Sequence, residues 1–179
     1  MALRQFVTGA APAPTSDAGD TATVRRIVGQ LEAMPRDKAR FLAGFAYILT
    51  RAAAADLEIS EVEEQVIEQL VVEHGGLTEA QAVLVAEMAR SQALLYGGTE
   101  DYLVTRQFKE LSTEEERLAL LRCCYLVGAA DDVITVEESD TLQEIARELD
   151  IDRAAVNAIR HEFEPKLAAI QALLRFRAS

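Results

Sequence analysis

The residues best suited to chemistry lie in two short acidic stretches that nearly repeat each other. AADLEISEVEE contains Asp56 and Glu63, and AADDVITVEES contains Asp131 and Glu138 at the same two places, 75 positions later. Carboxylate oxygens are the ligands that Ca²⁺ and Mg²⁺ prefer in proteins. If the two stretches approach each other in the fold, these carboxylates can share one divalent cation. The repeat therefore indicates a metal site at Asp56, Glu63, Asp131 and Glu138.

The same stretches also have a purely structural interpretation. Ser60 precedes Glu63 by three positions, and Thr135 precedes Glu138 by three, which is the spacing of a helix capping box. The Asp of each stretch stands at the end of the preceding helix, where the helix dipole disfavours a carboxylate. A hydrogen bond from an amide of the turn would offset that cost, and so would a cation. The residues alone leave both interpretations open.

Helical periodicity predicts that both glutamates point inward. On a helical wheel, Glu63 and Glu138 each lie within the apolar face of the helix they begin. These faces consist of Val62, Val66, Ile67 and Leu70 in the first copy and of Thr141, Leu142, Ile145 and Leu149 in the second. A buried carboxylate is costly unless it is satisfied. We therefore expect each glutamate to meet backbone donors, a partner or an ion.

The surrounding sequence predicts helices throughout. Apolar residues recur at helical spacing from Thr21 onward, first at Val24, Ile27, Val28 and Leu31 and then at Phe41, Phe45, Ile48, Leu49 and Ala52. Further helices are expected over about 61–74, 78–96 and 100–109, from Ser112, after Thr135 to about Leu149, from Asp152, and through Phe163 to about Phe176 with a bend or restart at Pro165. Each copy of the repeat is then an apolar helix, an acidic turn and an amphipathic helix. We expect an all-α, compact helical bundle with two pseudo-symmetric helix-loop-helix units over residues 21–179, preceded by a flexible Ala/Pro-rich tail over residues 1–20.

Composition narrows the classes of partner. The chain has 179 residues with 30 acidic against 18 basic side chains, a formal net charge of −12. Such a surface repels nucleic acid and anionic lipid headgroups, and favours a cation or a basic protein surface. No apolar run reaches the roughly 20 residues that cross a bilayer, so we expect no membrane insertion. Cys123 and Cys124 are adjacent, too strained a pair for a disulfide, and indicate reduced core thiols in the cytoplasm.

The other chemical candidates are weaker. His74 and His161 are not spaced with a second His or a Cys as in zinc sites, and Cys123 lacks the sequence signature of a nucleophile. Enzymes with a dimetal centre in a helical bundle normally show Glu-x-x-His. Here the residues three before the two histidines are Val71 and Ala158. We therefore expect no enzymatic activity.

The repeated pattern A-D-x-x-I-[ST]-x-x-E, at residues 55–63 and 130–138, resembles that of the TerB-like tellurite-resistance family. The resemblance covers residues about 20 to 165. It implies a compact all-helical bundle of internal pseudo-symmetry in the cytoplasm, without established enzymatic activity and associated with tellurite and other stress responses. It also implies divalent-cation binding through Asp56, Glu63, Asp131 and Glu138. The family commonly has Gly directly after the Asp, where this chain has Leu57 and Asp132.

Two functions follow from these observations. The first is a non-enzymatic acidic module of the stress and tellurite-resistance type that binds a divalent cation, Ca²⁺ or Mg²⁺, or a partner protein. The alternative is a protein-protein interaction scaffold whose acidic turns only cap helices. An apolar strip on the last helix either closes the bundle or forms a homodimer; it consists of Leu167, Ile170, Leu173 and Leu174.

Overall fold

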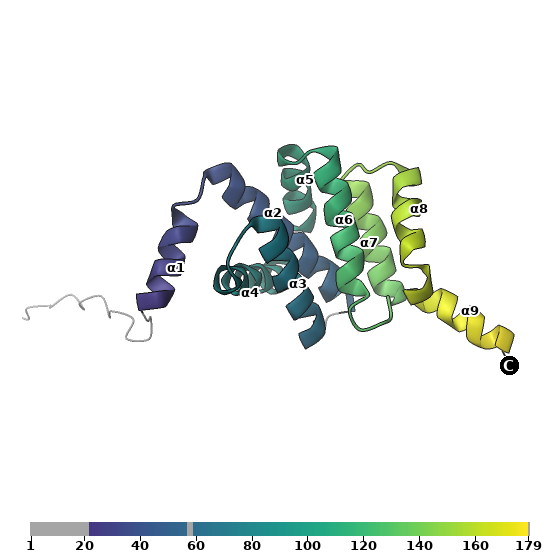
Figure 1. Ribbon diagram of the computed structural model, residues 1–179. Helices are drawn as coiled ribbons and strands as arrows, with labels where there is room; N and C mark the ends of the chain where they lie inside the picture. Colours follow the sequence, from purple (N-terminus) through teal and green to yellow (C-terminus); the bar gives the residue numbers. More distant parts are fainter. Residues whose placement is uncertain (1–21, 57–58, 179) are drawn as a thin grey trace, which may run out of the picture.

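The computed structural model describes residues 22–56 and 59–178, except for the side chains of residues 22–24, 56 and 178. The described part contains nine α-helices, two 3₁₀ segments and no strand, which confirms the predicted all-α fold (Figure 1). The elements are α1 Ala22–Glu32, α2 Arg36–Ala53, η1 Ala54–Asp56, α3 Glu61–Gly75, α4 Glu79–Tyr96, α5 Asp101–Leu111, α6 Glu114–Gly128, α7 Val136–Glu148, α8 Arg153–Glu162, η2 Glu164–Lys166 and α9 Ala168–Ala178. The predicted tail over residues 1–20 lies outside the described residues. No helix among the described residues is both long and apolar enough to cross a membrane.

Short polar side chains determine where the helices begin. Four helices start with a complete capping box, which consists of two hydrogen bonds. The hydroxyl of the capping Ser or Thr accepts from the backbone amide of the residue three positions later. The side chain of that later residue accepts from the backbone amide of the cap. The four caps are Ser60, Thr78, Thr113 and Thr135. Asp152 caps α8 through the amide of Ala154. The helix before Gly76 ends because Gly76 takes a left-handed conformation with φ +61°.

The two copies of the repeat lie side by side at the centre of the bundle. α2 and α3 form one helix-turn-helix unit, and α6 and α7 form the other (Figure 1). α2 packs against α6 and α7, and α3 packs against α6. The predicted internal symmetry therefore brings the starts of α3 and α7, which carry the two glutamates, into the same region of the fold.

The hydrophobic core follows the predicted stripes with a few exceptions. Phe45, Ile48 and Leu49 of α2 and Leu120, Leu121 and Cys124 of α6 are almost completely buried. Both cysteines are free and buried, as predicted. Val28 and Val62, by contrast, are 39% and 47% exposed. They belong to the predicted apolar faces, at places that no described element covers completely.

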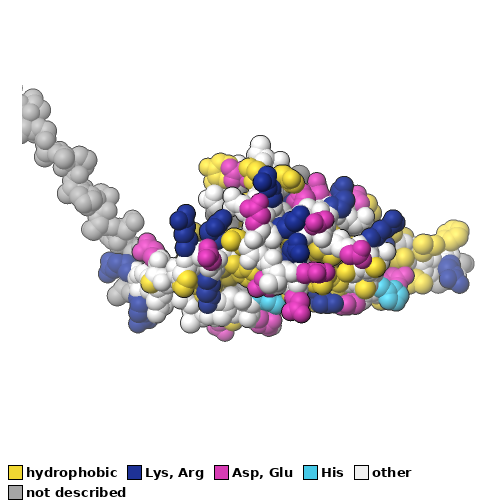
Figure 2. All heavy atoms as spheres, turned by 90° about the horizontal axis from the view of Figure 1, so that it is seen from above, with side chains coloured by type: hydrophobic (Ala, Val, Ile, Leu, Met, Phe, Trp, Pro, Cys, Tyr) yellow, Lys and Arg dark blue, Asp and Glu magenta, His cyan; other side chains and the backbone are white. Residues whose placement is uncertain are grey.

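The two ends of the molecule are less enclosed than its centre. Figure 1 shows α1 at one end and α9 projecting from the other. The predicted apolar strip divides: Leu167, directly before α9, is buried and Ile170 is partly buried, whereas Leu173 and Leu174 are 57% and 55% exposed. Figure 2 shows hydrophobic side chains gathered at this end of the surface. The strip therefore closes the bundle only at its N-terminal half.

Candidate functional site

Glu63 begins α3 and is 5% exposed, as the helical wheel predicts. Its Oε2 accepts from both the amide and the hydroxyl of Ser60, each at 2.7 Å. The amide of Glu63 in turn donates to the Ser60 hydroxyl at 3.3 Å. The capping box therefore provides the donors that a buried carboxylate needs.

Glu138 occupies the equivalent place in α7 and is 4% exposed. Its Oε2 accepts from the amide of Thr135 at 2.7 Å, and its own amide donates to the Thr135 hydroxyl at 3.1 Å. Burial, together with the negative charges of Glu63 and Asp131, raises the pKa of Glu138 to about 7, although the Thr135 bonds act to lower it. The charge of Glu63, 75 positions away in sequence, thus acts on Glu138 in the fold.

Asp131 is exposed and accepts a hydrogen bond from the amide of Val133 at 3.2 Å. This is the turn-stabilising bond that the structural interpretation predicts. The next residue, Asp132, adopts φ +77°, a conformation that Gly adopts without strain. Asp132 therefore has the left-handed backbone conformation that would suit the Gly commonly found at this position in the family.

The C-terminal segment holds the second turn from outside. The amide of Ile134 donates to the Lys166 carbonyl at 2.8 Å, and the amide of Ala168 donates to the Ile134 carbonyl at 2.9 Å. Lys166 also pairs with the Asp132 carboxylate, and the side chain of Gln171 donates to the Asp132 carbonyl at 3.2 Å. These bonds offset the strain of the left-handed Asp132 and fix the turn that precedes Glu138.

The structure brings three of the four predicted metal ligands into one region but does not complete a site from them. Glu63, Asp131 and Glu138 interact electrostatically. Among the described residues, no group of three or more His, Cys, Asp or Glu side chains is close enough to hold an ion. Asp56 ends η1, and its side chain lies outside the described residues, as does Leu57. The described residues alone do not fit a metal ion, and the predicted site stays a prediction that depends on Asp56.

Arg51 forms a buried ion cluster that the sequence analysis missed. This guanidinium is 8% exposed, and it donates to Glu148 through two bonds of 2.6 and 3.2 Å. It also lies 3.0 Å from Glu144 and 3.6 Å from Asp101, and donates to the Thr105 hydroxyl at 3.1 Å. One residue of α2 thereby connects α5 and α7.

Tyr47 extends this cluster by one turn of α2. Its hydroxyl donates to Asp101 at 2.8 Å, and Asp101 also accepts from the amide of Gly98 at 2.9 Å. Burial, together with the bond to Asp101, raises the pKa of Tyr47, which keeps the hydroxyl protonated as a donor. The partners of Arg51 and Tyr47 are 50 or more positions away in sequence. The available sequence signal was a basic residue close behind the apolar stripe of α2.

Cys123 and His74 meet between α6 and α3, with Sγ and Nε2 separated by 3.4 Å. Burial raises the pKa of Cys123 to about 11, and the charge of Glu73 adds to the effect. The thiol is therefore protonated at neutral pH, in contact with the imidazole. The His74 ring also packs on Phe45 with ring centroids 5.2 Å apart. This contact completes the core rather than activating a nucleophile.

Comparison with known proteins supports one family. The family model described as tellurite resistance protein TerB matches residues 42–161. The matched region begins within α2 and ends within α8. It therefore contains both acidic turns and the Arg51 cluster. No curated protein and no solved structure matches the chain.

Proposed function

The chain belongs to the family of the tellurite resistance protein TerB, and on that premise we propose that it is a non-enzymatic module of the tellurite and stress-resistance type whose two acidic turns bind one divalent cation between them. Asp56 and Glu63 provide the ligands of the first turn, and Asp131 and Glu138 provide those of the second. Ca²⁺ and Mg²⁺ are the candidate ions, because all four ligands are carboxylates.

The observation that carries this proposal is that the charge of the buried Glu63 acts on the buried Glu138. Each places a carboxylate in a region of low polarity, and the negative charge of Glu63 raises the pKa of Glu138. Like charges in such a region repel each other, and a cation between them removes the repulsion. Each glutamate uses Oε2 for its cap, while Oε1 of neither accepts a hydrogen bond within the described residues. The Oε1 atoms are therefore the natural ligands for an ion.

The proposal contains no catalytic step. The raised pKa of Cys123 opposes a role as a nucleophile. Burial raises the pKa of Cys124 as well, and both thiols are free. Reduced thiols of this kind suit the cytoplasm, where disulfides are rare, and we place the protein there as part of the proposal.

The test is thermal melting of the metal-stripped protein with and without Ca²⁺, Mg²⁺, Mn²⁺ or Zn²⁺ at millimolar concentration. An ion that binds only the folded state raises the melting temperature by mass action, and a rise of several degrees is expected for at least one ion. The double variant Asp56→Asn, Asp131→Asn should lose this rise. Asp140→Asn, which alters an exposed acid of α7, is the matched control and should retain it. A double variant that responds to the ion as the parent does would disprove the site.

A second function is favoured by the completeness of the caps. Every hydroxyl and carboxylate of the two capping boxes has its predicted bond, and Asp131 has its turn bond. In this second function the acidic turns only cap helices, and the protein is an interaction scaffold. A melting temperature that none of the four ions changes, together with a measured self-association or a bound partner protein, would favour this second function.

A further inference from the structure

An apolar groove lies beside α2, between α4 and α5. Its volume is about 490 Å³, within the range of roughly 300–1,000 Å³ that is usual for binding pockets. α2 provides the floor, and α4 and α5 provide the walls; the lining includes Ala43, Gly44, Met88, Ala89, Val104 and Phe108. The groove is therefore built from three helices of the matched region.

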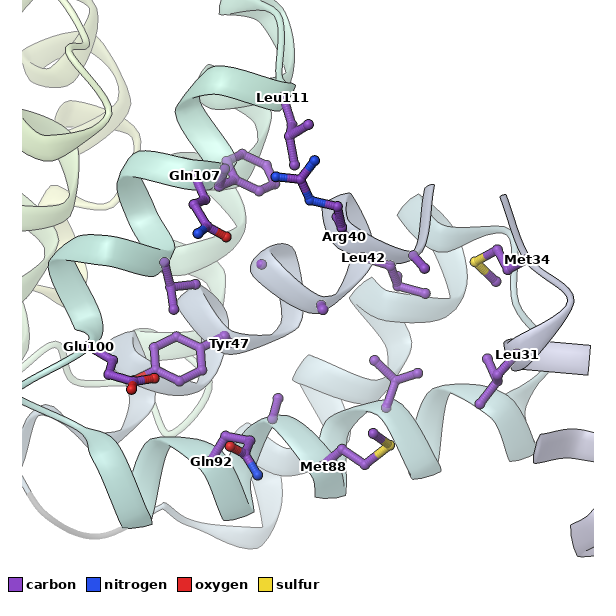
Figure 3. A pocket seen from close by; sticks show the side chains of 17 residues that line it. Leu31, Met34, Arg40, Leu42, Tyr47, Met88, Gln92, Glu100, Gln107 and Leu111 are labelled. Atoms are coloured by element: carbon purple, nitrogen blue, oxygen red, sulfur yellow. The ribbon is translucent and has the colours of Figure 1, made fainter. Parts of the chain in front are cut away.

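The groove has an apolar bottom and an exposed edge. A Cβ added to Gly44 would lie 3.2 Å from Cδ2 of Phe108, so the Phe108 ring rests directly on the α2 backbone. Phe108 is buried, whereas Met88 at the edge is 64% exposed. Figure 3 shows Leu31 and Met34 at one end of the groove, and Glu100 beside Tyr47 at the other. Such a groove suits the apolar side chains of an amphipathic helix.

α9 is a helix of that kind, and no described element covers the apolar side chains of its C-terminal half. It has 11 residues, and isolated helices shorter than about 12–15 residues are marginal in water. Three of its large apolar side chains are mostly exposed, namely Leu173, Leu174 and Phe176, and the last is 83% exposed. Their burial against another surface would stabilise the helix.

α9 and the groove lie at opposite ends of the molecule, α9 beyond α8 and the groove between α4 and α5 near α1 (Figure 1). The α9 of one chain therefore does not cover the groove of the same chain. The charges favour contact between two copies. The last turn of α9 carries Arg175 and Arg177. Glu100 at the groove end is exposed and makes no ion pair with any described residue.

From these observations we propose that α9 of one copy docks in the α2-α4-α5 groove of a second copy. Leu173 and Phe176 enter between the α4 and α5 walls over Ala43. The basic end of α9 lies at the Glu100 end of the groove, away from Arg40 on the rim. This contact joins two different surfaces, so two copies close it reciprocally or a series of copies extends it. It is independent of the proposed cation site.

The test is the oligomeric state of the full chain, measured by sedimentation velocity from low micromolar to submillimolar concentration. The parent protein should self-associate in this range. A groove variant, Ala43→Trp, and a tail variant, Leu173→Asp with Phe176→Asp, should each weaken the association by about tenfold or more. Ala158→Trp and Leu126→Asp place the same side chains at exposed positions of α8 and α6 and should leave it unchanged. Circular dichroism first establishes that every variant is folded.

Mixing the two defective variants decides which surfaces meet. The groove variant retains an intact α9, and the tail variant retains an intact groove, so their mixture should form a one-to-one complex that neither variant forms alone. A contact between two α9 helices, or between two grooves, would not be restored in this way.

A charge exchange provides a second criterion: Glu100→Arg and Arg177→Glu should each weaken association, and the two together should restore it. A parent chain that is monomeric throughout, or a mixture that stays monomeric, would overturn the proposal.

Discussion

Glu138 is the residue at which the two turns are most clearly coupled. Its carboxylate is buried at the start of α7, and both burial and the charges of Glu63 and Asp131 raise its pKa to about 7. A pKa above the usual 4.5 of glutamate means that the folded state binds this proton more tightly than the unfolded state does. The protein therefore has a proton-dependent stability in the same place as its proposed cation site.

The pH dependence of stability follows directly. The free energy of unfolding should fall as pH rises from about 4.5 to about 7, and the Glu138 contribution should be constant above that range. Glu138→Gln retains an oxygen for the Thr135 amide but removes the charge. This variant should nearly equal the parent near pH 4.5 and exceed it by roughly 3 kcal/mol at pH 8. Urea unfolding in EDTA at several pH values measures the difference.

The matched control for this prediction is Glu116→Gln. Glu116 occupies the same place in the capping box of α6, where its Oε2 accepts from the Thr113 amide at 2.7 Å, but it is exposed. Its substitution should leave the dependence on pH as in the parent. A Glu138→Gln variant whose stability changes with pH as steeply as the parent's would show that the Glu138 charge is not destabilised by the fold.

At the scale of residues, the sequence predicted side-chain contacts correctly where the two partners are close together in the chain. The hydroxyl of Ser60 and the carboxylate of Glu63 are three positions apart, so the capping box and the inward direction of the glutamate could both be predicted. The Cys123 contact with His74 could not, because it depends on how α3 packs against α6. The metal prediction remains untested for the same reason, since it requires the relative placement of four side chains from two turns.

At the scale of elements, Arg51 is the principal polar connection between α2 and its neighbours. It joins α5 through Thr105 and α7 through Glu148, whose side chain is only 11% exposed. Removing one member of a buried ion pair leaves the other without a partner, and this costs more than the pair contributes. The packing of α5 and α7 on α2 should therefore depend on this one guanidinium.

Substitution of Arg51 tests that dependence. Arg51→Met should lower the free energy of unfolding by about 3–5 kcal/mol, because Glu148 is left buried and unpaired. Arg122→Met, which removes the half-exposed pair with Glu162, should cost less than about 1 kcal/mol. Chemical denaturation of the two variants provides the comparison. The prediction fails if the two losses are alike. Adding Glu148→Leu to Arg51→Met should recover part of the loss.

The order of elements was more predictable than their contacts. Repeating apolar spacing, four caps and the Gly75–Gly76 pair define the helices to within one or two residues, including the restart at Pro165 that separates α8 from α9. The pattern could not show that α9 leaves Leu173 and Leu174 exposed, since a helix with an apolar face looks the same whether or not a neighbour covers it. Arg51 was missed because its acidic partners are up to 97 positions away.

At the scale of the whole molecule, the net charge of −12 is the dominant long-range feature. Acidic side chains outnumber basic ones and are spread over the surface that Figure 2 shows. Self-repulsion of this kind destabilises a folded chain. It is screened by salt over a Debye length of about 10 Å at 0.1 M. Any cation should therefore stabilise this protein to some extent by screening, whether or not it binds at the two turns.

This general effect gives the last prediction. Raising NaCl from about 0.01 to 0.3 M should increase the melting temperature of the metal-stripped protein, because screening weakens repulsion among exposed carboxylates more than attraction within the buried Arg51 cluster. The Asp56→Asn, Asp131→Asn double variant should show nearly the same rise, since it removes only two of 30 acids. A divalent ion compared with NaCl at equal ionic strength then separates the two effects. If the divalent ion stabilises the parent more than NaCl does, and does not do so for the double variant, the difference measures binding at the turns. A melting temperature that falls with NaCl would show that ion pairs, not repulsion, dominate the electrostatics of this acidic chain.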